Sequence, residues 1–122
     1  GGKLVRPTIF LDEEDTRKEK EEADAEQVVT PETAASIEMM LADVMTEGTG
    51  SKLKNDQYTV AGKTGSAEFE TGKETHAWFT GYAPAENPQL AVSVIVEEGG
   101  SGGAAAAPIA RAVFDNWFSR NK

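Results

Sequence analysis

Residues 60–68 read Val-Ala-Gly-Lys-Thr-Gly-Ser-Ala-Glu, and the alternation of small and polar residues in this segment is typical of a β-strand. Successive side chains on a strand point to opposite faces, so Thr64 and Ser66 share one face and Lys63 lies on the other. Gly65 has no side chain and would let another backbone approach closely. The edge of such a strand offers backbone N–H and C=O groups, two hydroxyls and one cation to an extended peptide. An ordinary strand with a bulge at its glycine is the simpler interpretation, and these residues alone leave it open.

The triplet Gly62-Lys63-Thr64 also suggests a phosphate-binding P-loop, but the flanking residues exclude that motif. A P-loop requires a glycine five residues before Gly62, where the chain has Gln57. It also requires a helix that begins at the lysine and threonine, whereas strand-like sequence continues here.

Strand-like sequence extends on both sides of this segment and predicts a sheet over residues 57–97. Extended segments at 58–69, 77–83 and 89–97 are joined by short connections, which favour an antiparallel meander. Both faces of the third segment carry apolar or small side chains, so we expect this strand to be covered on both sides.

Helical patterns precede and follow the sheet. We expect one helix over residues 30–47, with Thr30 as its N-cap, and a stripe of apolar residues comprising Ala34, Ile37, Leu41 and Val44 with Met40 and Met45 beside it. A second helix is expected over residues 105–118, with Pro108 in its first turn and an apolar face wide enough to need a sheet beneath it; Trp117 and Phe118 are assigned to the core. The fold class is therefore α+β: a helix, a three-stranded antiparallel meander and a C-terminal helix packed on the sheet.

Charge and composition limit the function classes. The chain has 122 residues and a formal net charge of −9, and residues 12–27 carry nine acids and three bases. That acidic segment has no large apolar side chain, so we expect a solvated loop or a frayed helical excursion. The acidic balance argues against a nucleic-acid partner, which needs a basic face. There is no Cys, and no apolar run approaches the ~20 residues that span a bilayer, so no membrane segment is expected. The chain does not begin with Met or a signal peptide, and we expect an internal or trimmed segment of a longer protein.

Several motifs in a fixed order resemble the end of a penicillin-binding protein transpeptidase domain of the high-molecular-mass, serine D,D-transpeptidase type. They are residues 62–68, the segment His76-Ala77-Trp78-Phe79-Thr80-Gly81-Tyr82-Ala83-Pro84, the strand at 90–97, the glycine loop that follows it, Ala107-Pro108-Ile109-Ala110 at a helix start, and the helix ending at Gly48-Thr49-Gly50. The resemblance covers about residues 28–118. It implies that residues 1–122 are the C-terminal portion of such a domain, a fragment of the β-lactamase/transpeptidase-like fold.

The resemblance also implies a chemistry. In this family a serine of a Ser-x-x-Lys motif attacks the D-Ala–D-Ala end of a peptidoglycan stem peptide, or a β-lactam, and a Lys-Thr-Gly strand forms the opposite wall of the site. Carried over, Lys63 lends positive charge and orients the hydroxyl of a Ser-x-Asn motif. Thr64 and Ser66 bind the substrate or drug carboxylate, and Gly65 allows its close approach. The backbone N–H of Ser66 supplies half of the oxyanion hole. No cofactor and no metal are implied.

The chain contains no correctly placed nucleophile. Ser51 and Ser119 each begin a Ser-x-x-Lys sequence, but Ser51 lies in a polar loop and Ser119 near the C-terminus. We therefore expect the chain alone to be inactive and to rely on the missing N-terminal part of the domain, which in the family pairs with the outer side of the third strand. The resemblance places the intact protein on the extracytoplasmic face of the cell membrane. Alternatives that stay open are a D,D-carboxypeptidase, a β-lactamase or a β-lactam sensor of the same superfamily, and a non-catalytic peptide-binding module.

Overall fold

A computed structural model describes residues 1–5, 7, 25–53 and 56–120 and divides into two compact units, residues 1–37 and 38–122. In the first unit β1 (Lys3–Leu4) pairs antiparallel with β2 (Glu26–Gln27). The carbonyl of Gly2 accepts the N–H groups of Val28 and Val29 at 3.0 and 3.2 Å. The expected loop over 12–27 is therefore wrong at its last two residues, because pairing with β1 satisfies their backbone groups. Residues 12–24 lie outside the described part of the chain.

Helix α2 (Pro31–Thr46) begins in the first unit and ends in the second, within one residue of the expected 30–47. The Thr30 hydroxyl caps it by accepting the N–H of Thr33 at 3.3 Å. A backbone hydrogen bond and the Thr30 hydroxyl lower the pKa of the Glu32 carboxyl in the first turn.

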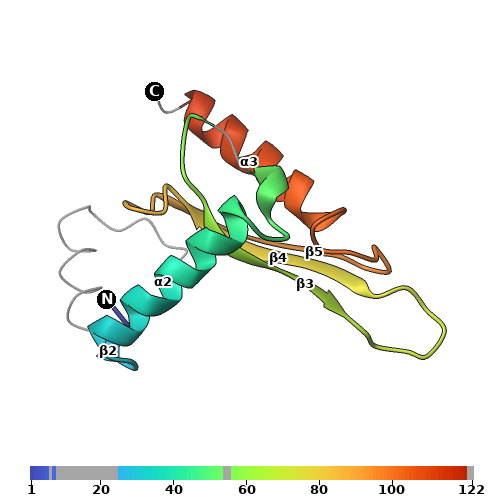
Figure 1. Cartoon of the computed structure of the whole chain (residues 1–122), viewed down its shortest axis with the longest axis horizontal. Coiled ribbons are helices and arrows are strands. Elements are labelled where there is room, and N and C mark those ends of the chain that lie inside the picture. The colour runs from blue at the N-terminus through green and yellow to red at the C-terminus, as the bar shows by residue number, and fades with distance from the viewer. Residues whose placement is uncertain (6, 8–24, 54–55, 121–122) are drawn as a thin grey trace. The chain divides into compact units, whose positions relative to one another are not determined.

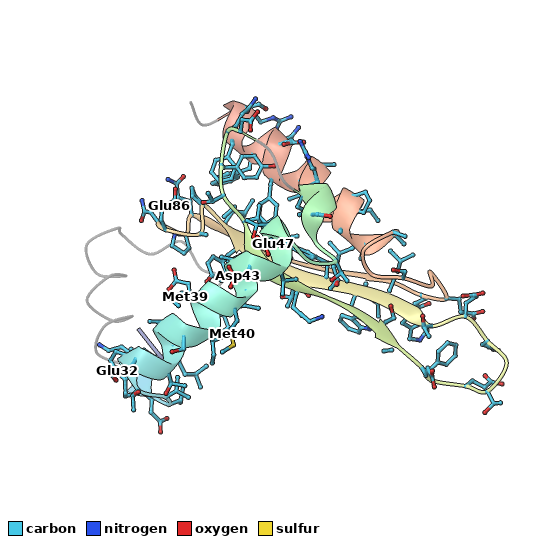
Figure 2. All side chains as sticks on the ribbon, viewed as in Figure 1. Glu32, Met39, Met40, Asp43, Glu47 and Glu86 are labelled. Atoms are coloured by element: carbon cyan, nitrogen blue, oxygen red, sulfur yellow. The ribbon has the colours of Figure 1, made fainter. Side chains whose placement is uncertain are left out.

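The apolar stripe expected on α2 is partly buried: Ala34, Leu41 and Val44 are half-buried, whereas Ile37 is 47% exposed. Met45 is the buried residue of this helix, whereas Met39 and Met40 are 68% and 65% exposed. Figure 2 shows these two side chains projecting from the helix beside Asp43 and Glu47. Helical periodicity predicts that residues share a face, but it does not say that another element covers that face.

The second unit contains the predicted meander. Strands β3 (Ala61–Ala67), β4 (His76–Ala83) and β5 (Leu90–Val96) pair antiparallel in the order β3-β4-β5 (Figure 1). The register places Thr64 opposite Phe79 and Phe79 opposite Val94, so these three residues lie in one row across the sheet.

Helix α3 (Ala106–Arg120) covers the face of the sheet that carries this row (Figure 1). Phe79 and Phe114 are fully buried between the two layers. Tyr58 packs its ring 4.7 Å from that of Phe118 and donates from its hydroxyl to Asp115 Oδ1 at 2.6 Å. The helix is thus anchored both by apolar contacts and by a hydrogen bond.

Two expectations about burial are wrong in the second unit. The opposite face of β4 and β5 carries Trp78 and Ile95, which are cross-strand neighbours and 41% and 45% exposed, so β5 is covered on one side in the described structure. Trp117, expected in the core, is 40% exposed because α3 turns Phe114 rather than Trp117 toward the sheet.

Candidate active site

The four residues singled out by the sequence lie together on β3, an edge strand of the described three-stranded sheet. The register places Thr64 and Ser66 on one face and Lys63 on the other; Lys63 and Ser66 are exposed, Gly65 is half-buried and Thr64 is buried. The expected strand, the alternation and the edge position are confirmed for the described residues. The site has one edge on β3 that no described strand pairs with.

Lys63 lies on the face opposite α3, next to Thr80 of β4. Its ammonium Nζ donates a hydrogen bond to the backbone carbonyl of Thr64 at 2.5 Å. On the same face, burial raises the pKa of Tyr82, and the nearby Glu38 carboxylate raises it further. Tyr82 is therefore a neutral phenol at physiological pH, and Lys63 supplies the positive charge on this part of the strand.

Thr64 is only 6% exposed, and its hydroxyl lies 2.5 Å from the hydroxyl of Thr49. Thr49 follows α2 in the turn that Gly50 closes by donating its N–H to Val44 O at 3.2 Å. Sequence reasoning missed Thr49 as a site residue. Its only signal was its place in Gly48-Thr49-Gly50, and that motif does not reveal that the turn folds back onto β3.

Ser66 is exposed, and its hydroxyl oxygen accepts the backbone N–H of Gly102 at 3.3 Å. Backbone polar groups two residues apart on a strand face the same side, so the N–H of Ser66 faces the same side as the carbonyl of Thr64. The described sheet thus brings together a lysine ammonium, an exposed hydroxyl and backbone groups of alternate residues on β3.

Gly65 and Gly102 differ in the space that a side chain would have. A Cβ built on Gly65 would lie 3.5 Å from Trp78 Cβ, which is an ordinary contact, whereas one built on Gly102 would lie 2.4 Å from the Gly65 carbonyl oxygen. Of these two glycines, Gly102, in the loop between β5 and α3, is therefore the one that has no room for a side chain.

The described residues contain no cluster of three or more His, Cys, Asp or Glu that could hold a metal ion. His76 has a structural environment: its ring stacks on Phe69 with centroids 4.0 Å apart, and its Nδ1 accepts the N–H of Glu98 at 3.0 Å. Ser119 donates its hydroxyl to the Asn116 carbonyl at 2.9 Å within the last turn of α3. None of the helices in the described part of the chain has the length and apolarity that a bilayer span requires.

Sequence comparisons extend over most of the chain. A family model described as the penicillin binding protein transpeptidase domain matches residues 1–115, which reaches further toward the N-terminus than the motifs do. The peptidoglycan D,D-transpeptidase MrdA of Haemophilus influenzae is 43% identical over 88 residues, covering 60% of this chain and 14% of that protein. The peptidoglycan D,D-transpeptidase PbpA of Mycolicibacterium smegmatis is 41% identical over 96 residues, covering 70% and 19%. The chain thus spans about a fifth or less of the length of these relatives.

Solved structures give the same result for the fold. The transpeptidase domain of the FtsI4 D,D-transpeptidase from Legionella pneumophila matches with a TM-score of 0.71 and 32% identity, over 80% of this chain and 39% of that one. The ceftriaxone acyl-enzyme complex of penicillin-binding protein A from Mycobacterium tuberculosis matches with a TM-score of 0.67 and 36% identity, over 73% and 22%. The helices and antiparallel meander are thus part of the transpeptidase/β-lactamase-like fold. The chain belongs to the penicillin-binding protein transpeptidase family.

Proposed function

We propose that this chain is part of a penicillin-binding D,D-transpeptidase that cross-links peptidoglycan stem peptides through a serine acyl-enzyme and is acylated by β-lactams. The observation that carries the proposal is the unpaired edge of β3 in the described sheet, which presents Lys63 and Ser66 within a chain of this family. Relatives named peptidoglycan D,D-transpeptidases, and a relative solved as a ceftriaxone acyl-enzyme, support it.

We assign the residues of the Lys-Thr-Gly motif distinct roles along this edge. Lys63 contributes positive charge to the wall of the site and orients a hydroxyl of the Ser-x-Asn motif, which lies outside this chain. The Ser66 N–H stabilises the oxyanion of the tetrahedral intermediate, together with the N–H of the nucleophilic serine. Gly65 leaves room for the substrate backbone.

The two hydroxyls serve the substrate carboxylate in different ways. The Ser66 hydroxyl binds it directly because that side chain is exposed. Thr64 is 6% exposed and its hydroxyl is bonded to that of Thr49, so in this proposal its contact with the carboxylate is more limited than that of Ser66.

The remaining part of the transpeptidase domain completes the fold in this proposal. The Legionella domain extends well beyond the matched segment, since the match covers 39% of it. A strand from that remaining part pairs with the open side of β5, and the same part supplies the serine nucleophile. Because peptidoglycan lies outside the cytoplasmic membrane, the site faces the extracytoplasmic side.

Fluorescent penicillin tests this proposal. We expect no covalent labelling of the 122-residue chain and stoichiometric labelling of the intact protein. In the intact protein, Lys63→Ala should slow acylation by about 100-fold, the scale of one electrostatic group in an active site.

Lys73→Ala is the matched control. Lys73 is an exposed lysine in the β3–β4 hairpin, 3.1 Å from Glu70 Oε2, and its removal should change the acylation rate by less than about threefold. Covalent labelling of the chain alone, or equal effects of the two substitutions, would contradict the assignment.

A further inference from the structure

The loop between β5 and α3 runs back to the β3–β4 hairpin and is bonded to it at several points. The N–H of Gly100 donates to the Thr75 carbonyl at 2.8 Å, and the Thr75 hydroxyl donates to the Gly100 carbonyl at 2.7 Å. Nearer the site, the N–H of Gly102 donates to Ser66 Oγ. These bonds hold the loop on the strand that carries the candidate site.

Gly102 sits where no side chain fits. A Cβ at this position would lie 2.3 Å from the Trp78 carbonyl oxygen and 2.4 Å from that of Gly65, and both obstacles are backbone atoms that cannot turn away. Its own carbonyl accepts the N–H groups of Ala106 and Ala107 at 3.1 and 2.9 Å. Gly102 therefore joins the first turn of α3 directly to the middle of the sheet.

Gly103, the next residue in the loop, contacts the turn that holds the Thr64 hydroxyl. A Cβ built on Gly103 would lie 2.7 Å from the Thr49 carbonyl oxygen, so the two backbones are in close contact. The hydroxyl of Thr49 in turn bonds that of Thr64. The Gly102–Gly103 dipeptide thus supports Ser66 directly and Thr64 through Thr49.

We infer that Gly102 is a positioning residue: its N–H orients the Ser66 hydroxyl so that the hydroxyl proton is donated to the carboxylate of a stem peptide or β-lactam. A hydroxyl has one proton and two lone pairs, and the Gly102 N–H occupies a lone pair. The proton then stays available for an acceptor at the open edge of β3, and a carboxylate offers only acceptors. The inference rests on the proposed function.

A first experiment tests the bond without reference to function. In the 122-residue chain, Ser66→Ala should speed amide hydrogen exchange of Gly102 and shift its NMR resonance, whereas Ser66→Thr, which keeps the hydroxyl, should leave both close to wild type. Unchanged exchange and shift in Ser66→Ala would overturn the inference and leave the proposed function standing.

A second experiment tests the orienting role in the intact protein, by comparing acylation rates with benzylpenicillin and with its methyl ester, which lacks the anionic carboxylate. Gly102→Ala should lower the acid-to-ester rate ratio about tenfold, the scale of one hydrogen bond to a charged group. Ser101→Ala, at an exposed neighbouring position, should leave the ratio unchanged. A purely structural role would slow both compounds equally and overturn the inference.

Two further variants keep the test decisive if Gly102→Ala does not fold. Thr75→Val removes the hydroxyl bond to Gly100 without a steric clash and should lower the same ratio by about threefold. In a Ser66→Ala background, Thr75→Val should have no additional effect on the ratio. An unaltered ratio in Thr75→Val overturns the inference, whereas absence of any acylation of the wild-type protein overturns the proposed function as well.

Discussion

At the scale of single residues, the hydrogen-bonded hydroxyls of Thr49 and Thr64 should contribute to the free energy of unfolding. Thr49→Val removes one partner and leaves the Thr64 hydroxyl buried without its hydrogen bond. We expect the free energy of unfolding to fall by about 1–3 kcal/mol, measured by urea denaturation. Thr80→Val is the control, because Thr80 is exposed on the opposite face of the sheet, and it should change stability by less than about 0.5 kcal/mol. Equal losses in both variants would show that the hydroxyl pair contributes nothing.

A second residue-scale feature is the Glu86 carboxylate in the turn between β4 and β5 (Figure 2). The Thr59 hydroxyl donates to Glu86 Oε2 and accepts the N–H of Ala85 at 3.0 Å. The hydrogen bond from Thr59 to the Glu86 carboxylate is the main reason that the pKa of Glu86 is lowered. Because the carboxyl pKa is lowered in the folded chain, the bond stabilises the turn fully at pH values above the ordinary carboxyl pKa. This contribution to stability is lost as the pH falls through the lowered pKa.

Thr59→Val should therefore raise the pKa of Glu86 toward its ordinary value, observed by NMR titration of the side-chain carboxyl carbon. Thr59→Ser keeps a hydroxyl and should keep the pKa low. If both variants titrate like the wild-type chain, the Thr59 hydroxyl is not the cause of the shift.

At the scale of elements, α3 has two apolar rows with different environments. Phe114 is fully buried against the sheet and lies 6.0 Å, ring to ring, from Tyr58, whereas the adjacent Val113 is 43% exposed. Phe114→Ala should lower the free energy of unfolding by about 3–5 kcal/mol, because it removes a large side chain and leaves a cavity. Val113→Ala should cost less than about 1 kcal/mol, since its side chain loses little contact. Chemical denaturation followed by circular dichroism distinguishes these outcomes, and similar costs for both would mean that α3 packs in another orientation.

At the scale of the whole molecule, the described sheet has one interior strand and two edges. β4 pairs on both sides, whereas β3 and β5 each pair on one side within the described residues. The outer apolar row of α3, which includes Ile109, Val113 and Trp117, lies next to Leu90 in a groove beside the β5 edge. An uncharged strand with an open edge is a site for pairing with additional chain.

We therefore predict a gradient of amide hydrogen exchange across the sheet of the isolated chain, with β4 protected longest and β5 exchanging faster. In the intact protein, where the proposed strand covers its open side, β5 should reach the protection of β4. NMR or mass spectrometry measures both states at several protein concentrations, because self-association through β5 would also protect it. Protection of β5 equal to that of β4 in a monomeric chain would contradict the open edge.

Short-range information predicted most of the architecture. Alternation in residues 60–68, the brief connections after it and the caps around residue 30 indicated the three strands and both helices, because these patterns depend only on side-chain periodicity and local hydrogen bonds. The same alternation predicted that Thr64 and Ser66 lie on one face of the strand and Lys63 on the other. Burial was predicted less well, as the exposure of Met40 and Trp117 illustrates, because an apolar stripe does not state what covers it.

The sequence by itself thus determined which residues lie on β3 and in what alternation, and its motifs determined the family. The tertiary structure alone decided that Thr49 reaches Thr64, and that Gly102 reaches Gly65 and Ser66 across a separation of more than thirty residues. Contacts of this kind depend on how the turn after α2 and the loop after β5 fold back onto one strand. Side-chain periodicity within one segment does not predict these contacts, because they form only in the packed tertiary structure.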